Sequence, residues 1–425
     1  MLSHAENEIV TRTGPATPMG NVMRRYWVPA LMSSELPKPD CAPVRVGLLS
    51  ERLVAFRDTN GKIGLVDEAC PHRGASLFLG RNEACGLRCV FHGWKFDVDG
   101  NCLDMMNELP ESRYKEKIHI TAYPTVEMGG VVWAYLGAKE RTPALPKFEW
   151  TQVPESHRHV SKIAQDCNWL QALEGGIDTA HAPILHRTLT TSTHRAGIRS
   201  NTDFVTGKPP SVEVDLTDYG YCYAGIRSLG DRGNHVRTHH YVLPFHQLRP
   251  KSPTFNGAAA YESVFGHMWV PIDDENCMVY NFAYSFGDKP ITVAEWEEVE
   301  ANLGRGPGET LPGFQSIRNR SNDWLIDRKV QKTETFTGIE GVNNQDLAVQ
   351  ESMGPIVDRT REHLSVTDRA VVAARRLLLQ AAKTVADGGD PPGLGESCYR
   401  VRAIEKTLPT EIKWRDVMLK EMFPT

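Results

Sequence analysis

The sequence predicts an α+β protein of two domains: an all-β domain over residues 1–150 and a larger domain over 151–425 in which helices surround an antiparallel sheet. Two domains are expected because a single hydrophobic core rarely grows to the size that 425 residues require. Short strand-like runs with turn signals crowd the first part, whereas strand-like and helical runs alternate in the second. Pro143 and Pro146 mark the boundary between the two parts.

The first domain begins with a short helical segment at 19–27 and continues as a series of short strands. The predicted strands cover residues 44–49, 53–56, 63–66, 94–96 and 131–136. Asn60-Gly61 lies between the second and third of these runs, and this dipeptide is typical of a two-residue hairpin turn. We therefore expect neighbouring strands of this domain to pair as antiparallel hairpins.

The second domain mixes predicted helices with predicted strands. A helix is expected over 166–186, where Asp166 can cap the first turn and apolar residues share one face. Strand-like runs are predicted at 211–216, 221–226, 241–243 and 277–284, and further helices at 291–303 and 368–386. This order of elements favours an α+β domain built on an antiparallel sheet.

Composition excludes several classes of protein. The net charge of −5 leaves no basic footprint for nucleic acid or for an anionic membrane. No apolar run approaches the ~20 residues of a membrane span. The N-terminal residues lack the apolar core of a signal peptide, so a cytoplasmic location is expected. The nine cysteines are odd in number and irregularly spaced, which does not favour a framework of disulfides.

Two short motifs in the first domain combine thiols with imidazoles. Cys70 and His72 form a Cys-x-His motif, and Cys89 and His92 follow as Cys-x-x-His after sixteen intervening residues. A Rieske [2Fe–2S] cluster uses two cysteines on one iron and two histidines on the other. A Cys2His2 zinc site takes the same residue types but usually pairs Cys with Cys and His with His along the chain. The alternating order therefore favours the Rieske cluster, with Cys70 and Cys89 on one iron and His72 and His92 on the other.

Gly74 and Gly93 follow the two motifs at equivalent positions. Glycine can bring the backbone close to a cluster and point N–H groups at its sulfur atoms, which tunes the reduction potential. An ordinary role in two turns explains these glycines equally well.

The second domain carries its own metal-binding pattern, Asp178-x-x-His181-x4-His186. Asp178 and His181 are three residues apart and would share one face of a helix. His181 and His186 are five apart, about 140° around a regular helix, so they would not converge on one metal. Pro183 should break the helix and allow His186 to turn back beside His181. Two adjacent imidazoles with a carboxylate suit non-haem Fe(II). If the chain had no cluster motif upstream, two structural histidines held by hydrogen bonds would be the simpler explanation.

Together the two motifs resemble those of the Rieske non-haem iron aromatic-ring oxygenases. Neighbouring segments are similar to the phthalate dioxygenase-like branch of that family, namely 17–20 (TPMG), 24–27 (RRYW), 67–74 (DEACPHRG) and 170–178 (LQALEGGID). The resemblance spans the whole chain. It implies an oxygenase component with a helix-grip-like catalytic domain, a Rieske [2Fe–2S] cluster and a mononuclear non-haem Fe(II).

The family implies a third iron ligand, a carboxylate far downstream of the histidine pair. Asp346 is our first choice, since 343–351 (NNQDLAVQE) is similar to the family's Asp-containing segment, and Glu351 is the reserve. The other acidic candidates are Asp323, Asp327, Glu334, Glu340 and Asp358. An alternative role for Asp346 is to cap a helix.

The resemblance also implies a role for Asp178 between subunits. In the family, electrons pass from the cluster of one chain to the iron of the next through a carboxylate that joins a cluster histidine to an iron histidine. Asp178 matches that position, so it should hydrogen-bond to His181 and contact His92 or His72 of a neighbouring chain. The implied assembly is a homotrimer or a stacked homohexamer.

From the family we expect O2-dependent cis-dihydroxylation of an aromatic carboxylate, such as phthalate, isophthalate or a substituted benzoate. Electrons from NADH would arrive through a separate flavin/iron–sulfur reductase, because no Gly-rich nucleotide fingerprint follows a strand in this chain. Arg227 is our first choice to bind the substrate carboxylate and Arg237 the second, because a guanidinium forms bidentate pairs with carboxylates. Histidines without ligand spacing, such as His239 and His267, are expected to be structural.

Two alternatives remain open for the reaction. Monooxygenation or oxidative O-demethylation of an aromatic acid would use the same two metal centres. A Rieske electron carrier, with a binding domain but no oxygenase chemistry, would lack the mononuclear iron.

Overall fold

The computed structural model describes residues 1–109, 111–190, 198, 200, 202–250 and 262–424. The chain forms two compact units, a small unit, Thr13–Leu145, and a large unit made of Met1–Arg12 and Pro146–Thr425. This division differs from the expected 1–150 and 151–425 at both ends. The first helix, α1 (His4–Thr11), belongs to the large unit because it packs against α10 (Arg369–Ala386).

The small unit consists mainly of strands and turns, with one short helix, α2 (Pro18–Met23), that ends before the predicted 19–27 does. Its strands form three sheets, in the orders β1-β11-β10, β2-β3-β4-β9 and β5-β6-β7-β8. The strands are β1 (Trp27–Met32), β2 (Val44–Leu48), β3 (Glu51–Arg57), β4 (Ile63–Asp67), β5 (Arg81–Glu83), β6 (Gly86–Arg88), β7 (Lys95–Phe96), β8 (Cys102–Asp104), β9 (Ala122–Tyr123), β10 (Thr125–Met128) and β11 (Val131–Tyr135). The expected hairpin joins β3 to β4, where Gly61 has a φ of +82° and Asp58 accepts the N–H of Asn60. The predicted all-β architecture is confirmed.

One antiparallel sheet organises the large unit. Its strand order is β12-β18-β17-β16-β15-β14-β13, and β19 pairs with β15. The strands are β12 (Arg158–Gln165), β13 (Ser211–Leu216), β14 (Gly220–Ser228), β15 (Asn234–Val242), β16 (His246–Pro250), β17 (Ser263–Pro271), β18 (Cys277–Ser285) and β19 (Glu405–Leu408). Strands β15, β17 and β18 are buried along almost their whole length. Polar side chains on these strands therefore lie inside the protein, where they need a partner or a ligand.

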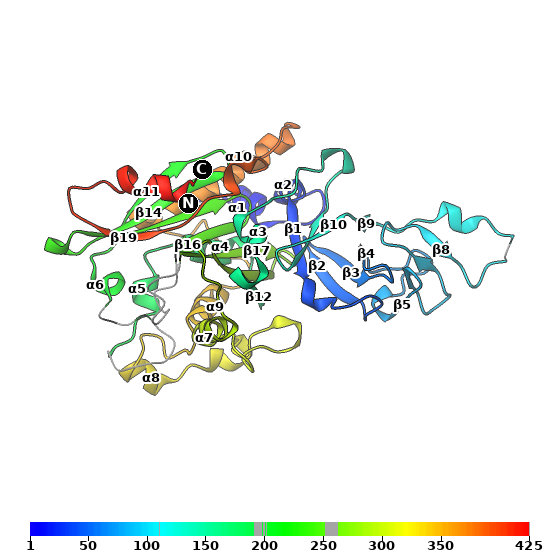
Figure 1. Cartoon of the computed structure of the whole chain (residues 1–425), viewed down its shortest axis with the longest axis horizontal. Helices are drawn as coiled ribbons and strands as arrows, with labels where there is room; N and C mark the ends of the chain where they lie inside the picture. The colour runs from blue at the N-terminus through cyan, green and yellow to red at the C-terminus, as the bar shows by residue number, and fades with distance from the viewer. Residues whose placement is uncertain (110, 191–197, 199, 201, 251–261, 425) are drawn as a thin grey trace. The chain divides into compact units, whose positions relative to one another are not determined.

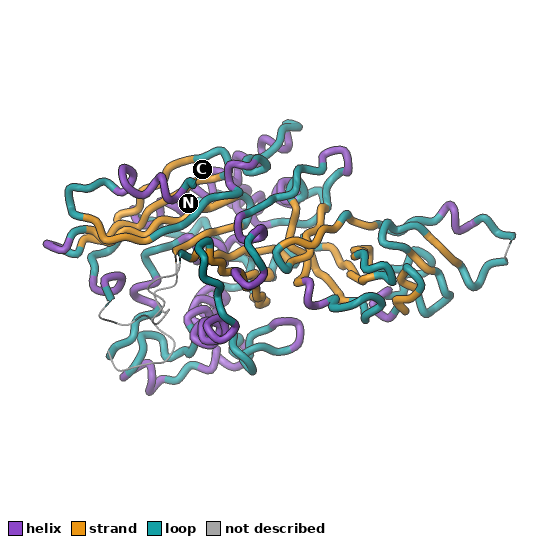
Figure 2. Tube along the Cα trace, viewed as in Figure 1, coloured by secondary structure: helices purple, strands orange, loops and turns teal. Residues whose placement is uncertain are grey.

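Helices pack against this sheet and against one another (Figure 1; Figure 2 shows the mixture of helix and strand). Helix α4 (Trp169–Ile177) packs against β17 and α9 (Val342–Ser352), α7 (Val293–Leu303) packs against α9, and α10 packs against β13 and β14. The other helices are α3 (Glu149–Gln152), α5 (Ala182–Leu185), α6 (Asp203–Thr206), α8 (Arg328–Thr333) and α11 (Trp414–Met422). The α+β class is confirmed. No helix within the described ranges is long and apolar enough to cross a membrane.

Helices α4 and α5 replace the single helix predicted over 166–186. The N-cap of α4 is Asn168 and not Asp166, and the Asn168 side chain accepts a backbone N–H at 3.1 Å. The helix ends before Asp178, and a turn leads from there into α5. Pro183 lies in the first turn of α5, where a proline fits because that position needs no intrahelical N–H donor. The break therefore precedes Pro183 and is not caused by it.

Two adjacent glycines allow α4 to approach its neighbours closely. A Cβ at Gly176 would lie 2.1 Å from Cη2 of Trp269 on β17, and a Cβ at Gly175 would lie 2.0 Å from Nε2 of Gln350 on α9. Both distances are too short for a real contact, so side chains at these positions would push the elements apart. Close packing of α4 on β17 and α9 thus depends on the two glycines.

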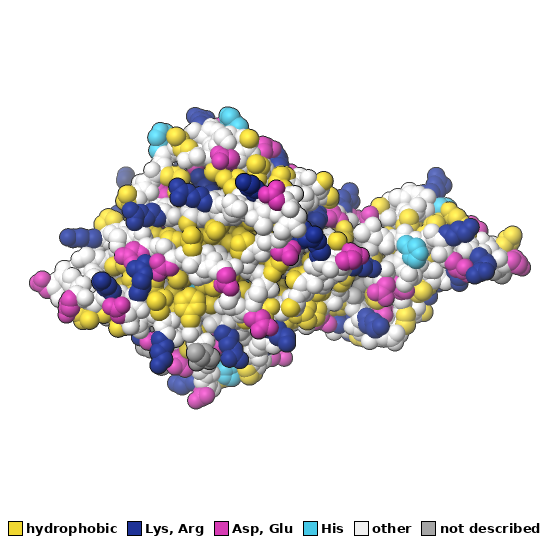
Figure 3. All heavy atoms as spheres, turned by 90° about the horizontal axis from the view of Figure 1, so that it is seen from above, with side chains coloured by type: hydrophobic (Ala, Val, Ile, Leu, Met, Phe, Trp, Pro, Cys, Tyr) yellow, Lys and Arg dark blue, Asp and Glu magenta, His cyan; other side chains and the backbone are white. Residues whose placement is uncertain are grey.

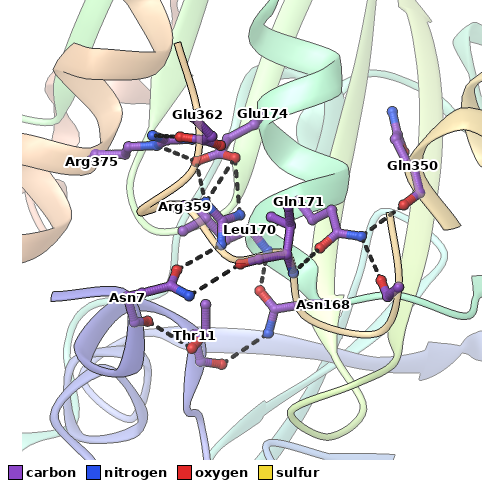
Figure 4. Close-up of polar contacts among 12 residues, drawn as sticks. Asn7, Thr11, Asn168, Leu170, Gln171, Glu174, Gln350, Arg359, Glu362 and Arg375 are labelled. Carbon is purple, nitrogen blue, oxygen red and sulfur yellow. Dashed lines mark hydrogen bonds and ion pairs between the residues drawn. The ribbon is translucent and has the colours of Figure 1, made fainter. Parts of the chain in front are cut away.

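A network of buried charges holds α4 from another side (Figure 4). Glu174 on α4 forms ion pairs with Arg359 at 2.9 Å and with Arg375 of α10 at 2.6 Å. Arg359 also donates to Oδ1 of Asn7 on α1 at 3.0 Å, and Arg375 pairs with Glu362 at 2.6 Å. The network joins α1, α4 and α10, so the helix that leads to the histidine pair is tied to the core of the large unit.

Candidate metal centres and substrate cavity

Two loops of the small unit carry the Cys-x-His and Cys-x-x-His motifs. One loop follows β4, and the other joins β6 to β7. The loops share one hydrogen-bonding pattern, in which each cysteine N–H donates to the carbonyl oxygen five residues later, at 2.9 Å for Cys70 and 2.8 Å for Cys89. Gly74 and Gly93, with φ values of +76° and +77°, donate back to the carbonyl oxygens of these cysteines. Their N–H groups therefore close the turns instead of pointing at the sulfur atoms.

The two thiols of these loops lie in the core of the small unit, and the two imidazoles are half-buried. Cys70 and Cys89 are each 2% exposed, and burial, with a smaller effect from the Cys89 thiol, raises the pKa of Cys70 to about 11. The ring centroids of His72 and His92 are 4.3 Å apart, and the Trp94 ring stacks on His72 at 4.5 Å. Nδ1 of His72 is buried without a hydrogen-bond partner among the described residues. Two neighbouring thiols, two adjacent imidazoles and an unpaired ring nitrogen fit the donor set of a Rieske cluster.

Three side chains from two separate segments converge in the large unit. His181 and His186 flank α5, Asp346 lies on α9, and their candidate ligand atoms lie within 4.8 Å of one another. Oδ1 of Asp346 is 3.3 Å from Nε2 of His181 and 3.2 Å from Nε2 of His186. This oxygen is buried and makes no well-formed hydrogen bond within the described structure. A buried carboxylate oxygen that faces two imidazole nitrogens fits non-haem Fe(II), and three protein ligands leave open positions on such an ion.

His181 and Asp346 each change the pKa of the other. Burial lowers the pKa of His181, but Asp178 and Asp346 outweigh burial and raise that pKa to about 10. Burial raises the pKa of Asp346, but the two imidazoles outweigh burial and hold that pKa well below its usual value. The Asp346 carboxyl is therefore ionised at neutral pH, and a metal ion bound here would take the place of a proton on His181.

Asp178 is the C-cap of α4 and does not share a helix face with His181, contrary to the prediction. Its Oδ1 accepts the N–H of Ala180 at 2.6 Å, and its Oδ2 lies 3.2 Å from Nδ1 of His181. With Nδ1–H directed at the carboxylate, Nε2 of His181 is left to face Asp346. The expected hydrogen bond between Asp178 and His181 is thus present, although a turn creates it and a helix does not.

The other acidic candidates have different roles. Glu351, the reserve, accepts the indole N–H of Trp324 at 2.7 Å. Asp327 is the N-cap of α8. Asp346 does not cap α9, because it lies in the second turn of that helix. Among the residues that the structure describes, Asp346 is the carboxylate that groups with the two histidines.

A cavity in the large unit contains this group. It is lined by Asp178, His181, His186 and Asp346 together with side chains from α6 and the sheet. The residues of α6 and the sheet are Phe204, Arg237, His239, Gln247, Arg249 and His267. A cavity that combines a candidate iron site with guanidinium groups is suited to an anionic ligand.

Three arginines near this cavity differ in their partners. Arg227, the first choice from the sequence, is buried, donates to Thr179 and does not line the cavity. Arg237 lines the cavity and forms an ion pair with Glu405. Arg249 also lines the cavity and has no carboxylate or hydrogen-bond partner within the described ranges, while burial and neighbouring arginines lower its pKa to about 10. The geometry therefore places Arg237 and Arg249, and not Arg227, beside the metal group.

Sequence reasoning misses Arg249, His239 and His267 as cavity residues and expects the two histidines to be structural. A signal for them exists in the alternation of polar side chains along buried strands. Arg237 and His239 are two apart on β15, and Gln247 and Arg249 are two apart on β16, so each pair points to one face of the sheet. Polar side chains on one face of strands that are buried along most of their length indicate a buried polar cavity.

Two family models match the chain. The Rieske [2Fe-2S] domain matches residues 26–122, and the family described as LigXa C-terminal domain like matches residues 134–423. The chain therefore belongs to the Rieske non-haem iron oxygenases, as an oxygenase component that carries a Rieske [2Fe–2S] cluster and a mononuclear non-haem iron.

Three curated relatives align with almost the whole chain. The 3-chlorobenzoate-3,4-dioxygenase oxygenase subunit of Comamonas testosteroni is 39% identical, over 96% of this chain and 96% of the relative. The phthalate 4,5-dioxygenase oxygenase subunit of Pseudomonas putida is 38% identical, over 98% and 94%. The 5,5'-dehydrodivanillate O-demethylase oxygenase subunit of Sphingobium sp. (strain NBRC 103272 / SYK-6) is 31% identical, over 99% and 89%. The resemblance to the phthalate dioxygenase-like branch is confirmed.

A solved structure has the same fold. The QL mutant of NdmA from Pseudomonas putida CBB5, solved with theobromine, matches with a TM-score of 0.62 and covers 93% of this chain and 99% of its own. The two sequences are 18% identical, so this match concerns the fold alone.

Proposed function

We propose that this oxygenase component uses O2 to cis-dihydroxylate an aromatic carboxylate, with a substituted benzoate, phthalate or isophthalate as substrate. The observation that carries the proposal is the presence of Arg249 in the same cavity as His181, His186 and Asp346. Arg249 is half-buried, and a cation shielded from water without a carboxylate partner is costly. A substrate carboxylate that pairs with Arg249 therefore gains affinity. The relatives at 39% and 38% identity are named for 3-chlorobenzoate and phthalate, which are both aromatic carboxylates.

The charge of the cavity favours one carboxylate over two. The charge of Arg237 is balanced by Glu405, whereas Arg249 has no such partner within the described structure. One unbalanced guanidinium suits a monoanion, so a substituted benzoate is our first choice of substrate and a phthalate our second. The neutral side chains of His239 and Gln247 line the same cavity and can contact ring substituents.

We assign Cys70 and Cys89 to one iron of the Rieske cluster and His72 and His92 to the other. The buried thiols and the adjacent imidazoles support this assignment. Histidine ligands leave the cluster less negative than four thiolates would, which raises its reduction potential. Stacking of Trp94 on His72 holds that ring in place.

We assign His181, His186 and Asp346 to the mononuclear Fe(II). When bound, this iron supplies O2 activation, with electrons that the cluster delivers one at a time. The protein orients the side chains that would bind this iron. Asp178 orients one of them, because it accepts the Nδ1–H of His181 and so leaves Nε2 to face Asp346. We also propose Asp178 as the contact to a cluster histidine of a neighbouring chain, on the basis of the family resemblance.

We propose an NADH-dependent flavin/iron–sulfur reductase as the electron donor and a homotrimer or stacked homohexamer as the assembly. The relatives are named as oxygenase subunits, which supports the need for further components. A donor that draws on NADH favours the cytoplasm as the location.

The surface charge is mixed in sign. On the face that Figure 3 shows, Lys and Arg side chains are interspersed with Asp and Glu and do not gather into a basic patch that would suit nucleic acid.

Oxidative O-demethylation, or another monooxygenation of an aromatic acid, is the second candidate function. It is favoured by the relative at 31% identity, which is named as an O-demethylase oxygenase subunit. A Rieske electron carrier is disfavoured, because potential iron ligands converge outside the cluster domain.

Product analysis tests the proposal. The purified protein is supplied with a flavin/iron–sulfur reductase, NADH and O2, and with 3-substituted benzoates, phthalate, isophthalate and methoxylated benzoates. We expect a cis-diol from at least one benzoate or phthalate, formed only when both NADH and O2 are present. A phenol and an aldehyde from the methoxylated acids alone would establish demethylation instead. Reduction of the cluster without an oxygenated product from any of these acids would contradict an oxygenase that acts on aromatic carboxylates.

A further inference from the structure

His186 is held at both ring nitrogens by adjacent residues of α9. Oε1 of Gln345 lies 2.8 Å from Nδ1 of His186, and Oδ1 of Asp346 lies 3.2 Å from Nε2. Consecutive helical residues point about 100° apart, so the two side chains can pass on opposite sides of one imidazole. His186 is 3% exposed and Gln345 is 1% exposed, so water does not compete for the hydrogen bond between them.

The amide of Gln345 can make this bond in one direction only. Its Nε2 donates to the carbonyl oxygen of Ile339 at 2.9 Å, so Oε1 is the atom that faces His186. An amide oxygen accepts hydrogen bonds and does not donate them, so Nδ1 of His186 carries a proton. A neutral imidazole with its proton on Nδ1 has its free lone pair on Nε2, the atom that faces Asp346.

The carbonyl that anchors Gln345 belongs to a segment that is itself held beside His186. The backbone after His186 bonds to this segment, and the N–H of Phe336 donates to the carbonyl oxygen of Arg187 at 3.1 Å. Ile339 follows Phe336 by three residues. The carbonyl group of Ile339 and the imidazole of His186 therefore belong to segments that are hydrogen-bonded to each other. This limits how far Gln345 can shift relative to His186.

We propose that Gln345 is a positioning residue of the iron site, which fixes His186 as the Nδ1–H tautomer and turns Nε2 toward the metal. This inference rests on the proposed function, because it takes His186 as an iron ligand. His181 receives the corresponding support from a carboxylate, Asp178, whereas His186 receives it from a neutral amide. A carboxylate partner raises the basicity of an imidazole more than an amide does, so the two histidines are unequal donors.

The Fe(II) affinity of the protein, depleted of mononuclear iron but with its Rieske cluster intact, measures this role. Gln345→Leu removes the acceptor, and Gln345→Asn is one methylene too short to span His186 and Ile339. Gln345→Glu keeps an acceptor for His186 and, as the protonated acid in this buried place, also a donor for the carbonyl oxygen of Ile339. Gln350→Leu is the matched control, because Gln350 is a second buried glutamine of α9 whose amide bonds to Gln165 and not to a candidate ligand. The paramagnetic resonance spectrum of the Fe(II) site with nitric oxide reports ligand geometry independently of affinity.

We expect Gln345→Leu to weaken Fe(II) binding about 10–100-fold and to change the nitric oxide spectrum, with Gln345→Asn changed in the same direction. Gln345→Glu should bind Fe(II) at least as tightly as the wild type, and Gln350→Leu should stay within about threefold of it even if it loses thermal stability. If Gln345→Leu does not fold, the difference in Fe(II) affinity between Gln345→Asn and Gln345→Glu tests the role of Gln345.

Wild-type affinity in Gln345→Leu or Gln345→Asn would overturn the role of Gln345. An equal loss in Gln345→Glu or in Gln350→Leu would overturn it too, because the effect would then come from packing of α9. A wild-type protein that binds no iron beyond its cluster would instead overturn the proposed function, so the two failures can be told apart.

Discussion

Oδ2 of Asp178 lies 3.2 Å from Nδ1 of His181, at the turn where α4 ends and α5 begins. The same carboxylate accepts the backbone N–H groups of Ala180 at 2.6 Å and of His181 at 3.3 Å. Burial raises the pKa of Asp178, but these donors outweigh burial and hold the pKa below its usual value. The turn thus places a fixed negative charge behind a candidate iron ligand.

Asp178→Asn should leave both metal centres in place and nearly abolish turnover. The asparagine Oδ1 can still accept N–H groups of the turn, so the backbone should keep its form, but the negative charge behind His181 is lost. We expect wild-type iron content and a wild-type cluster spectrum, with product formation slower by about 100-fold or more. Product formation at a near-wild-type rate would show that this carboxylate does not link the two centres.

Arg249→Met should raise KM for the aromatic acid more than it lowers kcat. Loss of a charged hydrogen-bonded pair costs about 2–3 kcal/mol, which corresponds to about 30–150-fold in KM. Arg249→Lys should recover part of this loss, because it restores the charge without the bidentate geometry. Arg415→Met is the control, since Arg415 pairs with Asp215 and does not line the cavity. A KM unchanged in Arg249→Met would move the carboxylate site to another residue, with Arg237 next to be tested.

The large unit should lose stability in acid because of Glu174. Burial raises the pKa of this carboxyl, but Arg359 and Arg375 outweigh burial and lower it (Figure 4). A carboxyl with a lowered folded pKa stabilises the protein above its unfolded pKa of about 4.3, and this contribution is lost as the pH falls through the folded pKa.

Glu174→Gln should therefore reduce the free energy of unfolding by about 3–5 kcal/mol at neutral pH, because it leaves buried guanidinium groups short of a partner. The difference from the wild type should shrink below about pH 4. Denaturant unfolding of both proteins across the acid range measures this. A difference that stays constant with pH would show that the charge of Glu174 is not what stabilises the network.

Gly176→Ala should destabilise the protein, although alanine is the better helix former. An alanine Cβ would meet the Trp269 ring at 2.1 Å, and that ring is buried. We expect a loss of about 1–3 kcal/mol from overpacking, where an exposed helix would gain about 1 kcal/mol. Gly395→Ala, where a Cβ would meet no atom within 4 Å, is the control and should be nearly neutral. Thermal unfolding followed by circular dichroism gives both values.

Features that depend on a few neighbouring residues could be predicted from the sequence. The Asn60-Gly61 turn, the strand at 211–216 and the helix at 291–303 are present, because turn chemistry and apolar periodicity act over short distances. The sequence also predicts that His181 and His186 converge, but it attributes the break in the helix to Pro183, whereas the break precedes that residue. The Asp178 side chain bonds to the backbone of the turn and ends α4 before Pro183 is reached.

Features that depend on distant segments could not be predicted. Arg249 reaches the cavity because β16 lies between β15 and β17 in the sheet, and no local pattern specifies that order. Gln345 is missed because its role depends on α9 lying beside His186, 159 positions earlier in the chain. Likewise, α1 joins the large unit through contacts with α10 at the other end of the sequence.

The iron content of the purified protein is the most direct measurement of the two metal centres. We predict about three irons per chain, two in the Rieske cluster and one at His181, His186 and Asp346. Asp346→Ala should retain about two irons, keep the cluster spectrum and form no oxygenated product. Two irons per chain in the wild type, or three in Asp346→Ala, would contradict the mononuclear site.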